Sequence, residues 1–135
     1  MAVLRIVANL AATDPQAARA FYEGVLGLSV VMDHGWILTF AAPDATAPPQ
    51  LSVARDGGSG TPVPDLSIEV SDVDTVHDAV RRAGLEITYP LTDEPWGVRR
   101  FFVRDPLGRL VNILAHSERR AAAAPQAALP TDRSR

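Results

Sequence analysis

Residues 13–28, TDPQAARAFYEGVLGL, carry the clearest structural signals in the chain. Asp14 belongs to the residue types that cap helix N-termini, and the proline after it fits the first helical position. Apolar residues then recur at helical spacing as far as Val25, and Gly24 and Gly27 supply termination signals. The stretch therefore predicts a short helix that begins after Asp14 and ends near Gly27.

The same order of signals returns in the second half of the chain. Asp72 caps a second predicted helix, and Gly84 ends it. One predicted strand precedes each helix and three follow it. The strands are expected at residues 5–11, 28–32, 36–41, 50–54, 66–70, 86–89, 98–104 and 109–116. Strand, helix and three strands thus occur twice, which is an internal repeat.

This repeat predicts an α+β fold of two βαβββ modules. Each module is too small to bury its own sheet, so the two are expected to form a curved mixed sheet with a concave pocket. We expect one domain at residues 1–118, comprising module one at 3–55, a linker at 56–64 and module two at 65–116, followed by an Ala/Pro-rich mobile tail at 119–135. The glycine-rich residues 57–60 are interpreted as a flexible connector, because neither a helix nor a lysine follows them as in a phosphate-binding loop.

Composition narrows the possible chemistry. The 135 residues are 47% hydrophobic and carry a formal net charge of −3, which is typical of a globular protein. No cysteine is present, which excludes disulfides, thiolate nucleophiles and Cys-based metal sites. All 13 basic residues are arginine, which excludes a lysine Schiff base or a lysine general base.

Charge and hydropathy also indicate the cell compartment. No run of about 18 apolar residues exists, and the first residues lack the features of a secretory signal. We therefore expect a cytoplasmic protein that does not enter a membrane. A pI of about 5.5 without a basic stripe gives nucleic-acid binding little electrostatic support. Heavy use of alanine and arginine suggests a bacterial source.

Three motifs in the chain resemble those of one protein family. Asp14, Phe21–Tyr22 and Leu26–Leu28 are similar to the D-x6-FY-x3-LGL signature that opens its domains. Ile68–Asp74 resembles the strand-to-helix passage of its second module, and Phe102–Gly108 resembles its F-x2-DP-x-G hairpin. Together they cover about residues 4–116. On these motifs the chain resembles the vicinal-oxygen-chelate superfamily, which includes glyoxalases, bleomycin-resistance proteins and extradiol dioxygenases.

Metalloenzymes of this superfamily take ligands from three strand positions, commonly His, His or Gln, and Glu. The resemblance places Val7, Asp65 and Asn112 at these positions. One carboxylate and one amide would bind a transition metal poorly. We therefore expect no metal cofactor. A divalent metal held by a non-standard set, such as Asp65, Glu69 and His116, is the alternative.

The resemblance also indicates where a small-molecule ligand would bind. Arg100 and Phe102 take positions that line the family's cavity, where a guanidinium could bind a carboxylate, phosphonate or enolate and a ring could stack. An ion pair of Arg100 with Glu94 or Asp105 is the open alternative. Trp96 is interpreted as a ligand wall, a packing residue or part of a subunit interface. The full expected ligand-binding set is Asn9, Trp36, Asp65, Ser67, Trp96, Arg100, Phe102 and Asn112.

A catalytic base is a further candidate feature. Glu69 shares strand parity with Asp65 and Ser67, and either carboxylate could act as a general base if burial raised its pKa. An exposed strand carboxylate is the competing interpretation of Glu69. The histidines His34, His77 and His116 are interpreted as surface or turn residues.

Three functions remain open on this basis. The favoured hypothesis is a metal-free homodimer that binds a small aromatic or amphipathic molecule, as in antibiotic-sequestering resistance proteins of the family. The second is a glyoxalase-like lyase or isomerase, or a dioxygenase-type enzyme, that uses a non-standard metal set or a carboxylate base. The third is a regulatory subunit without a ligand.

Overall fold

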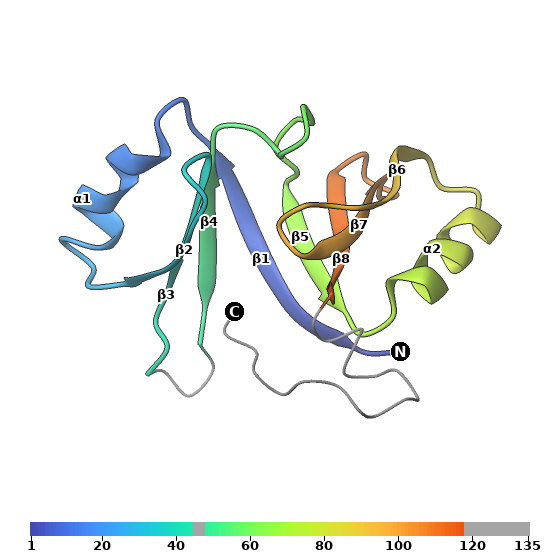
Figure 1. The fold of residues 1–135 in the computed structure, drawn as a ribbon, viewed down its shortest axis with the longest axis horizontal. Coiled ribbons are helices and arrows are strands. Elements are labelled where there is room, and N and C mark those ends of the chain that lie inside the picture. Colours follow the sequence, from blue (N-terminus) through green and yellow to red (C-terminus); the bar gives the residue numbers. More distant parts are fainter. Residues whose placement is uncertain (45–47, 118–135) are drawn as a thin grey trace. The chain divides into compact units, whose positions relative to one another are not determined.

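The computed structural model of the chain describes residues 1–44 and 48–117 (Figure 1). The Ala/Pro-rich segment expected at 119–135 lies outside the described residues. Within them, the strands are β1 (Val3–Ala11), β2 (Ser29–Asp33), β3 (Ile37–Ala41), β4 (Gln50–Ala54), β5 (Leu66–Val70), β6 (Ile87–Asp93), β7 (Val98–Arg104) and β8 (Leu110–His116), and the helices are η1 (Pro15–Ala18), α1 (Arg19–Tyr22) and α2 (Val73–Arg82). No helix of the described part is long and apolar enough to cross a membrane.

The chain divides into two compact units. The first unit is residues 6–67, and the second unit is residues 1–5 together with the chain from Ile68 onward. Their boundaries fall inside β1 and β5, so both strands contribute to both units.

In the first unit, the hydrogen-bonded strand order is β2-β3-β4-β1. The pair of β1 and β4 is parallel, and the other two pairs are antiparallel. Leu38, Phe40 and Val53 are buried on the side of the sheet that carries the helical segment. Tyr22 packs on Phe40 with ring centroids 5.5 Å apart. This contact fixes the helical segment to its strands.

The helical segment of the first unit is shorter than the sequence predicts. The Asp14 carboxylate accepts a hydrogen bond from the backbone N–H of Gln16, which confirms the predicted cap. The chain then forms a 3-10 turn and a single α-helical turn that ends at Tyr22. Gly24 explains the early end because glycine lowers helix stability. Hydrogen-bonded turns continue to Gly27, whose φ of 75° ends the segment.

The second unit repeats this arrangement with the strand order β5-β8-β7-β6. Asp72 caps α2 by accepting a hydrogen bond from the N–H of Thr75, as the sequence predicts. The expected bounds of β4, β5 and β7 are confirmed to the residue, whereas β6 extends to Asp93, beyond the predicted end at Tyr89. The α+β class and the repeated βαβββ order are therefore confirmed.

The segment interpreted as a flexible connector forms a hydrogen-bonded turn. The N–H of Gly57 donates to the carbonyl of Thr61 at 2.7 Å, and the N–H of Thr61 donates to the carbonyl of Gly58 at 3.0 Å. The Thr61 hydroxyl donates to the same carbonyl at 2.7 Å. Gly58, Ser59 and Gly60 have positive φ, which explains why glycine dominates this segment.

Candidate functional site

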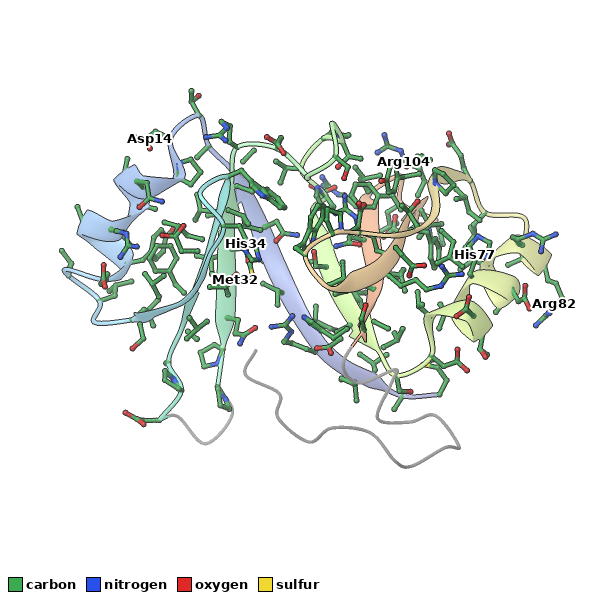
Figure 2. The ribbon with its side chains drawn as sticks, in the orientation of Figure 1. Asp14, Met32, His34, His77, Arg82 and Arg104 are labelled. Carbon is green, nitrogen blue, oxygen red and sulfur yellow. The ribbon has the colours of Figure 1, made fainter. Side chains whose placement is uncertain are left out.

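Alternate residues of β7 lie on opposite faces of the second unit's sheet. Arg99 donates a hydrogen bond to Asp74 of α2, and the ring centroids of Phe101 and of His77 in α2 lie 4.9 Å apart. Figure 2 shows His77 on the side of α2 that faces the strands, while Arg82 points away from them. Arg100 and Phe102 therefore lie on the other face. We call it the distal face and define it by Val98, Arg100, Phe102, Asn112, Leu114 and His116, which pair across β7 and β8.

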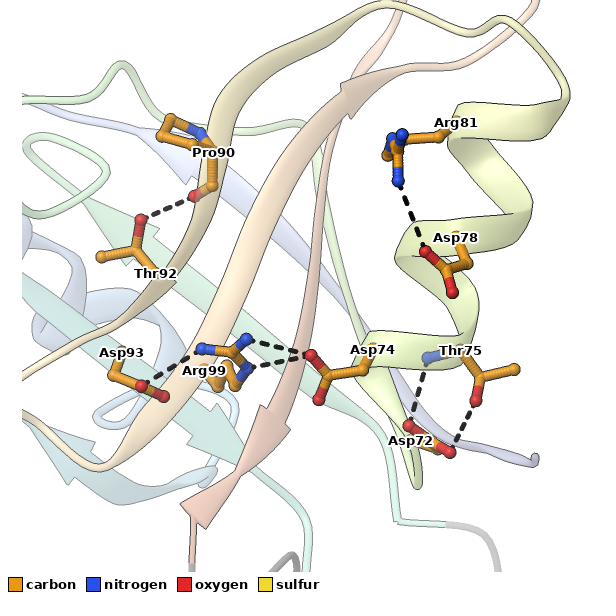
Figure 3. Close-up of polar contacts among 9 residues, drawn as sticks. All are labelled: Asp72, Asp74, Thr75, Asp78, Arg81, Pro90, Thr92, Asp93 and Arg99. Carbon is orange, nitrogen blue, oxygen red and sulfur yellow. Dashed lines mark hydrogen bonds and ion pairs between the residues drawn. The ribbon is translucent and has the colours of Figure 1, made fainter.

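On the helix-covered face, Arg99 bridges two acidic residues (Figure 3). Its guanidinium lies 2.9 Å from Asp74 of α2 and 3.1 Å from Asp93 at the end of β6. The hydrogen bonds that Arg99 donates to Asp74 are the main reason why the pKa of Arg99 lies above its usual value. This bridge ties α2 to the edge of the sheet, so Arg99 has a structural role.

On the distal face, Arg100 is buried in an aromatic cluster. Its Nε donates to Oε2 of Glu94 at 2.8 Å, and both side chains are only 3% exposed. The Tyr89 hydroxyl donates to the same oxygen at 2.8 Å. The rings of Tyr89, Trp96 and Phe102 lie 4.8–5.2 Å from the guanidinium carbon. The ion pair with Glu94, left open by the sequence, is present in the structure and neutralises the charge of Arg100.

A second polar cluster surrounds Glu69. This side chain is 1% exposed, so it is not the exposed strand carboxylate of the competing interpretation. Its Oε2 lies 2.8 Å from Nδ1 of His116, and its Oε1 lies 3.3 Å from Nε of Arg5. His116 is 14% exposed. A carboxylate with a cation on one oxygen and an imidazole on the other positions the imidazole.

The distal face thus brings together several of the residues expected to bind a ligand. Asn112 of β8 is opposite Phe102 of β7, and it is buried. Trp96 is half-buried above Arg100. Asn112 and His116 share the parity of β8, so the Glu69 cluster borders the same face.

The remaining expected ligand-binding residues lie in the first unit. The side-chain amide of Asn9 donates to the hydroxyl of Ser67 at 3.0 Å, and the backbone N–H of Asn9 donates to the carbonyl of Asp65 at 3.1 Å. The Asp65 residue is exposed. Trp36 stacks on His34 at 6.2 Å beside the predicted hairpin turn. A ligand-binding role for these four residues stays a prediction.

The side chains that the resemblance places at the family's metal-ligand positions are poor ligands for a metal ion. Val7 is buried and has a hydrocarbon side chain with no donor atom. Across residues 1–44 and 48–117, no group of three or more His, Asp or Glu side chains could hold a metal. In the alternative set, Glu69 and His116 direct Oε2 and Nδ1 at each other at hydrogen-bond distance.

The sequence interpretation missed two features of the site. His116 was interpreted as a surface or turn residue, or as a ligand in the alternative metal set, and Arg5 was assigned no role. Strand parity could have found the histidine, because it places His116 on the same face of β8 as Asn112. No sequence signal pointed to Arg5 as the partner of Glu69.

Residues 4–113 match the sequence model of the Glyoxalase/Bleomycin resistance protein/Dioxygenase superfamily. The chain belongs to this superfamily. This confirms the resemblance inferred from the three motifs. The sequence matches no curated protein.

Solved structures share the fold of this chain. A superfamily member from Vibrio splendidus 12B01 is 19% identical with a TM-score of 0.58, over 84% of this chain and 99% of that one. Methylmalonyl-CoA epimerase from Mycobacterium tuberculosis is 22% identical with a TM-score of 0.58, over 90% of this chain and 91% of that one. A structure described as NAD-dependent benzaldehyde dehydrogenase from Legionella pneumophila is 18% identical with a TM-score of 0.66, over 83% of this chain and 99% of that one. These identities establish the fold alone.

Proposed function

We propose that this superfamily member binds a small aromatic or amphipathic organic molecule on the distal face, without a metal ion. The observation that carries the proposal is the buried Arg100, which is neutralised by Glu94 and surrounded by three aromatic rings. Binding sites for small molecules combine apolar and aromatic walls with a few fixed polar groups. The distal face has this composition.

The charge balance of the cluster favours a particular ligand chemistry. Because Glu94 already occupies Arg100, the guanidinium is poorly suited to bind a ligand carboxylate. It instead supports the half-buried ring of Trp96 from one side. An indole ring can also stack on a planar ring of a ligand. Asn112 adds an amide that can orient a polar substituent.

Sequestration of a planar antibiotic in the cytoplasm is the specific role that we propose for this binding. It is tested by calorimetry against glycopeptide, enediyne and anthraquinone-like compounds. The chain has two tryptophans, so each single variant leaves one reporter. In Trp36→Phe, where Trp96 remains, a bound ligand should quench the fluorescence, whereas Trp96→Phe should lose both the quenching and most of the affinity.

Two results would count against this proposal. If calorimetry detects no heat of binding for any compound of the panel, the proposed sequestration role loses its support. Quenching that survives in Trp96→Phe and disappears in Trp36→Phe would move the ligand to the first unit.

A metal-dependent lyase, isomerase or dioxygenase is the alternative activity. The valine at the first ligand position and the direct hydrogen bond between Glu69 and His116 speak against it. Elemental analysis of protein purified without chelators tests it. A stoichiometric amount of nickel, zinc, manganese, iron or cobalt would favour the enzyme over the binding protein.

We also propose a homodimer. Phe21, Val25 and Leu26 are large apolar residues of the first unit that are more than half exposed. They lie within one hydrogen-bonded segment, since the N–H groups of Val25 and Leu26 both donate to the carbonyl of Phe21. Contiguous exposed apolar residues are typical of interaction surfaces. Light scattering should give twice the chain mass for the wild type, and Phe21→Ser with Val25→Ser should shift it toward the monomer.

A further inference from the structure

The cluster of Arg5, Glu69 and His116 has the composition of an acid–base site. All three residues belong to the second unit, and they come from β1, β5 and β8. The contacts of 3.3 Å and 2.8 Å assign one carboxylate oxygen of Glu69 to Arg5 and the other to His116. A buried carboxylate is costly unless it is paired, and Arg5 supplies that pairing. The second oxygen then accepts a hydrogen bond from the imidazole.

This arrangement fixes the tautomer of His116. A carboxylate acceptor at Nδ1 requires the proton on that nitrogen, which leaves Nε2 as a lone-pair acceptor. In the part of the chain that the structure describes, Nε2 has no hydrogen bond. His116 is therefore a positioned proton acceptor.

His116 lies next to the proposed ligand-binding surface. It pairs with Val98 across β7 and β8, and the next pair on the same face is Leu114 with Arg100. Diagonal neighbours on one sheet face lie about 7–8 Å apart, which is within the span of an aromatic ring and its substituent. A ring stacked on Trp96 above Arg100 can thus present a substituent to His116.

The charges facing His116 favour an anionic substituent. Arg5 and Glu69 compensate each other, as do Arg100 and Glu94 on the distal face. A proton that His116 takes from a ligand would therefore give this surface one further positive charge. An oxyanion on the ligand would neutralise it through a charge-assisted hydrogen bond.

We propose that His116, held by Glu69, accepts the proton of an acidic hydroxyl on the bound ligand, a phenol or an enol, and binds the resulting oxyanion. The O–H bond breaks and its electron pair stays on oxygen, while an N–H bond forms at Nε2. No oxidant or reductant takes part. The proposal rests on the binding function above and adds the chemical class of the ligand.

The test uses 4-nitrophenol, whose anion has a visible absorption band, and 4-nitroanisole, which has no ionisable hydroxyl. Below the pKa of the free phenol, wild-type protein should bind 4-nitrophenol with the band of the anion. His116→Gln should abolish the band and weaken 4-nitrophenol binding about tenfold, the worth of one hydrogen bond to a charged group. The same variant should weaken 4-nitroanisole binding much less, because that compound has no hydroxyl proton for His116 to accept.

Two further variants complete the experiment. His34→Gln changes an exposed turn histidine of the first unit and should keep the band. Glu69→Gln should reduce the band while binding of 4-nitroanisole persists, provided that circular dichroism shows a folded chain. If Glu69→Gln fails to fold, His116→Gln still decides the test. His116 is partly exposed, so its replacement should leave the fold intact.

Each outcome separates the two proposals. If 4-nitroanisole binds but 4-nitrophenol binds without the anion band, the acid–base inference is wrong and the binding function stands. A band that persists in His116→Gln likewise overturns the inference. If neither compound binds, the aromatic binding function on which the inference rests is contradicted as well.

Discussion

Nε of Arg100 lies 2.8 Å from Oε2 of Glu94 with both side chains nearly inaccessible, while the neighbouring pair of Arg99 and Asp93 is much more exposed. Consecutive residues of β7 thus form two ion pairs on opposite faces of one sheet. Removing one partner of a buried pair leaves an uncompensated charge in a low-dielectric environment. An exposed pair loses little because water replaces the partner. The two pairs therefore allow the loss of a buried partner and the loss of an exposed partner to be compared within one protein.

We expect Glu94→Gln to lower the free energy of unfolding by about 3–5 kcal/mol, because Arg100 loses its counter-charge inside the aromatic cluster. Asp93→Asn should cost less than about 1 kcal/mol, because Asp93 is exposed and Arg99 keeps Asp74. Urea denaturation of both variants checks the contrast. If both variants lose the same free energy of unfolding, Arg100 is not held by Glu94.

A double variant separates the ion pair from the packing. Arg100→Met with Glu94→Leu removes both charges and keeps apolar volume, so it should recover most of the stability lost in Glu94→Gln. Failure to recover would indicate that the stacking of Arg100 on Tyr89 and Trp96 contributes more than the pairing of charges.

The N-cap of α2 makes a pH-dependent contribution. The hydroxyl of Thr75 donates to Oδ2 of Asp72 at 2.7 Å and is the main reason why the pKa of Asp72 lies below its usual value. A depressed pKa in the folded state stabilises the protein above the usual aspartate pKa, and this stabilisation is lost as pH falls through the folded-state value. Thr75→Val should therefore raise the pKa of Asp72.

Carboxyl-carbon NMR titration measures this shift directly. The stability difference between wild type and Thr75→Val should be complete at neutral pH and shrink in acid as Asp72 takes up its proton. Thr75→Ser retains the hydroxyl and should behave like the wild type. An unchanged Asp72 pKa in Thr75→Val would assign the shift to the backbone N–H of Thr75 instead.

Buried hydroxyls in the first unit provide a third prediction. Thr39 of β3 and Ser52 of β4 are cross-strand partners whose hydroxyl oxygens lie 2.7 Å apart, and both residues are buried. Thr39→Val leaves the Ser52 hydroxyl buried without this partner, which should cost about 1–3 kcal/mol. Adding Ser52→Ala should restore part of the loss. A double variant that is less stable than Thr39→Val would contradict this account.

The sequence was sufficient for the repeat because its signals are local. A cap such as Asp72 acts on the next three residues, and strand parity identifies the face of Arg100 without any tertiary information. The sequence was insufficient for the partner of Arg100, since Glu94 and Asp105 are both close to it in the chain. The structure separates them because the Asp105 carboxylate accepts the backbone N–H groups of Leu107 and Arg109 in its own turn.

Longer separations explain what sequence inspection missed in the candidate site. The contact between Glu69 and His116 joins residues 47 positions apart, and the contact with Arg5 depends on the pairing of β1 with β5. No local sequence pattern indicates either contact. Strand parity grouped Glu69 with Asp65 and Ser67, but the identity of its partners required the strand order.

The turn at residues 57–61 provides a final prediction. A Cβ at Gly57 would collide with the backbone carbonyl of Pro62 and the hydroxyl of Thr61, so Gly57→Ala should cost about 1–3 kcal/mol or shift the turn. Gly35→Ala is the matched control, because Gly35 has a φ of 82° and open space around its Cβ position. It should cost only about 1 kcal/mol, from left-handed backbone strain. Adding Thr61→Ala should not rescue Gly57→Ala, since the Pro62 carbonyl remains in place. Thermal denaturation measures all three variants, and a rescue would assign the close contact to the threonine side chain alone.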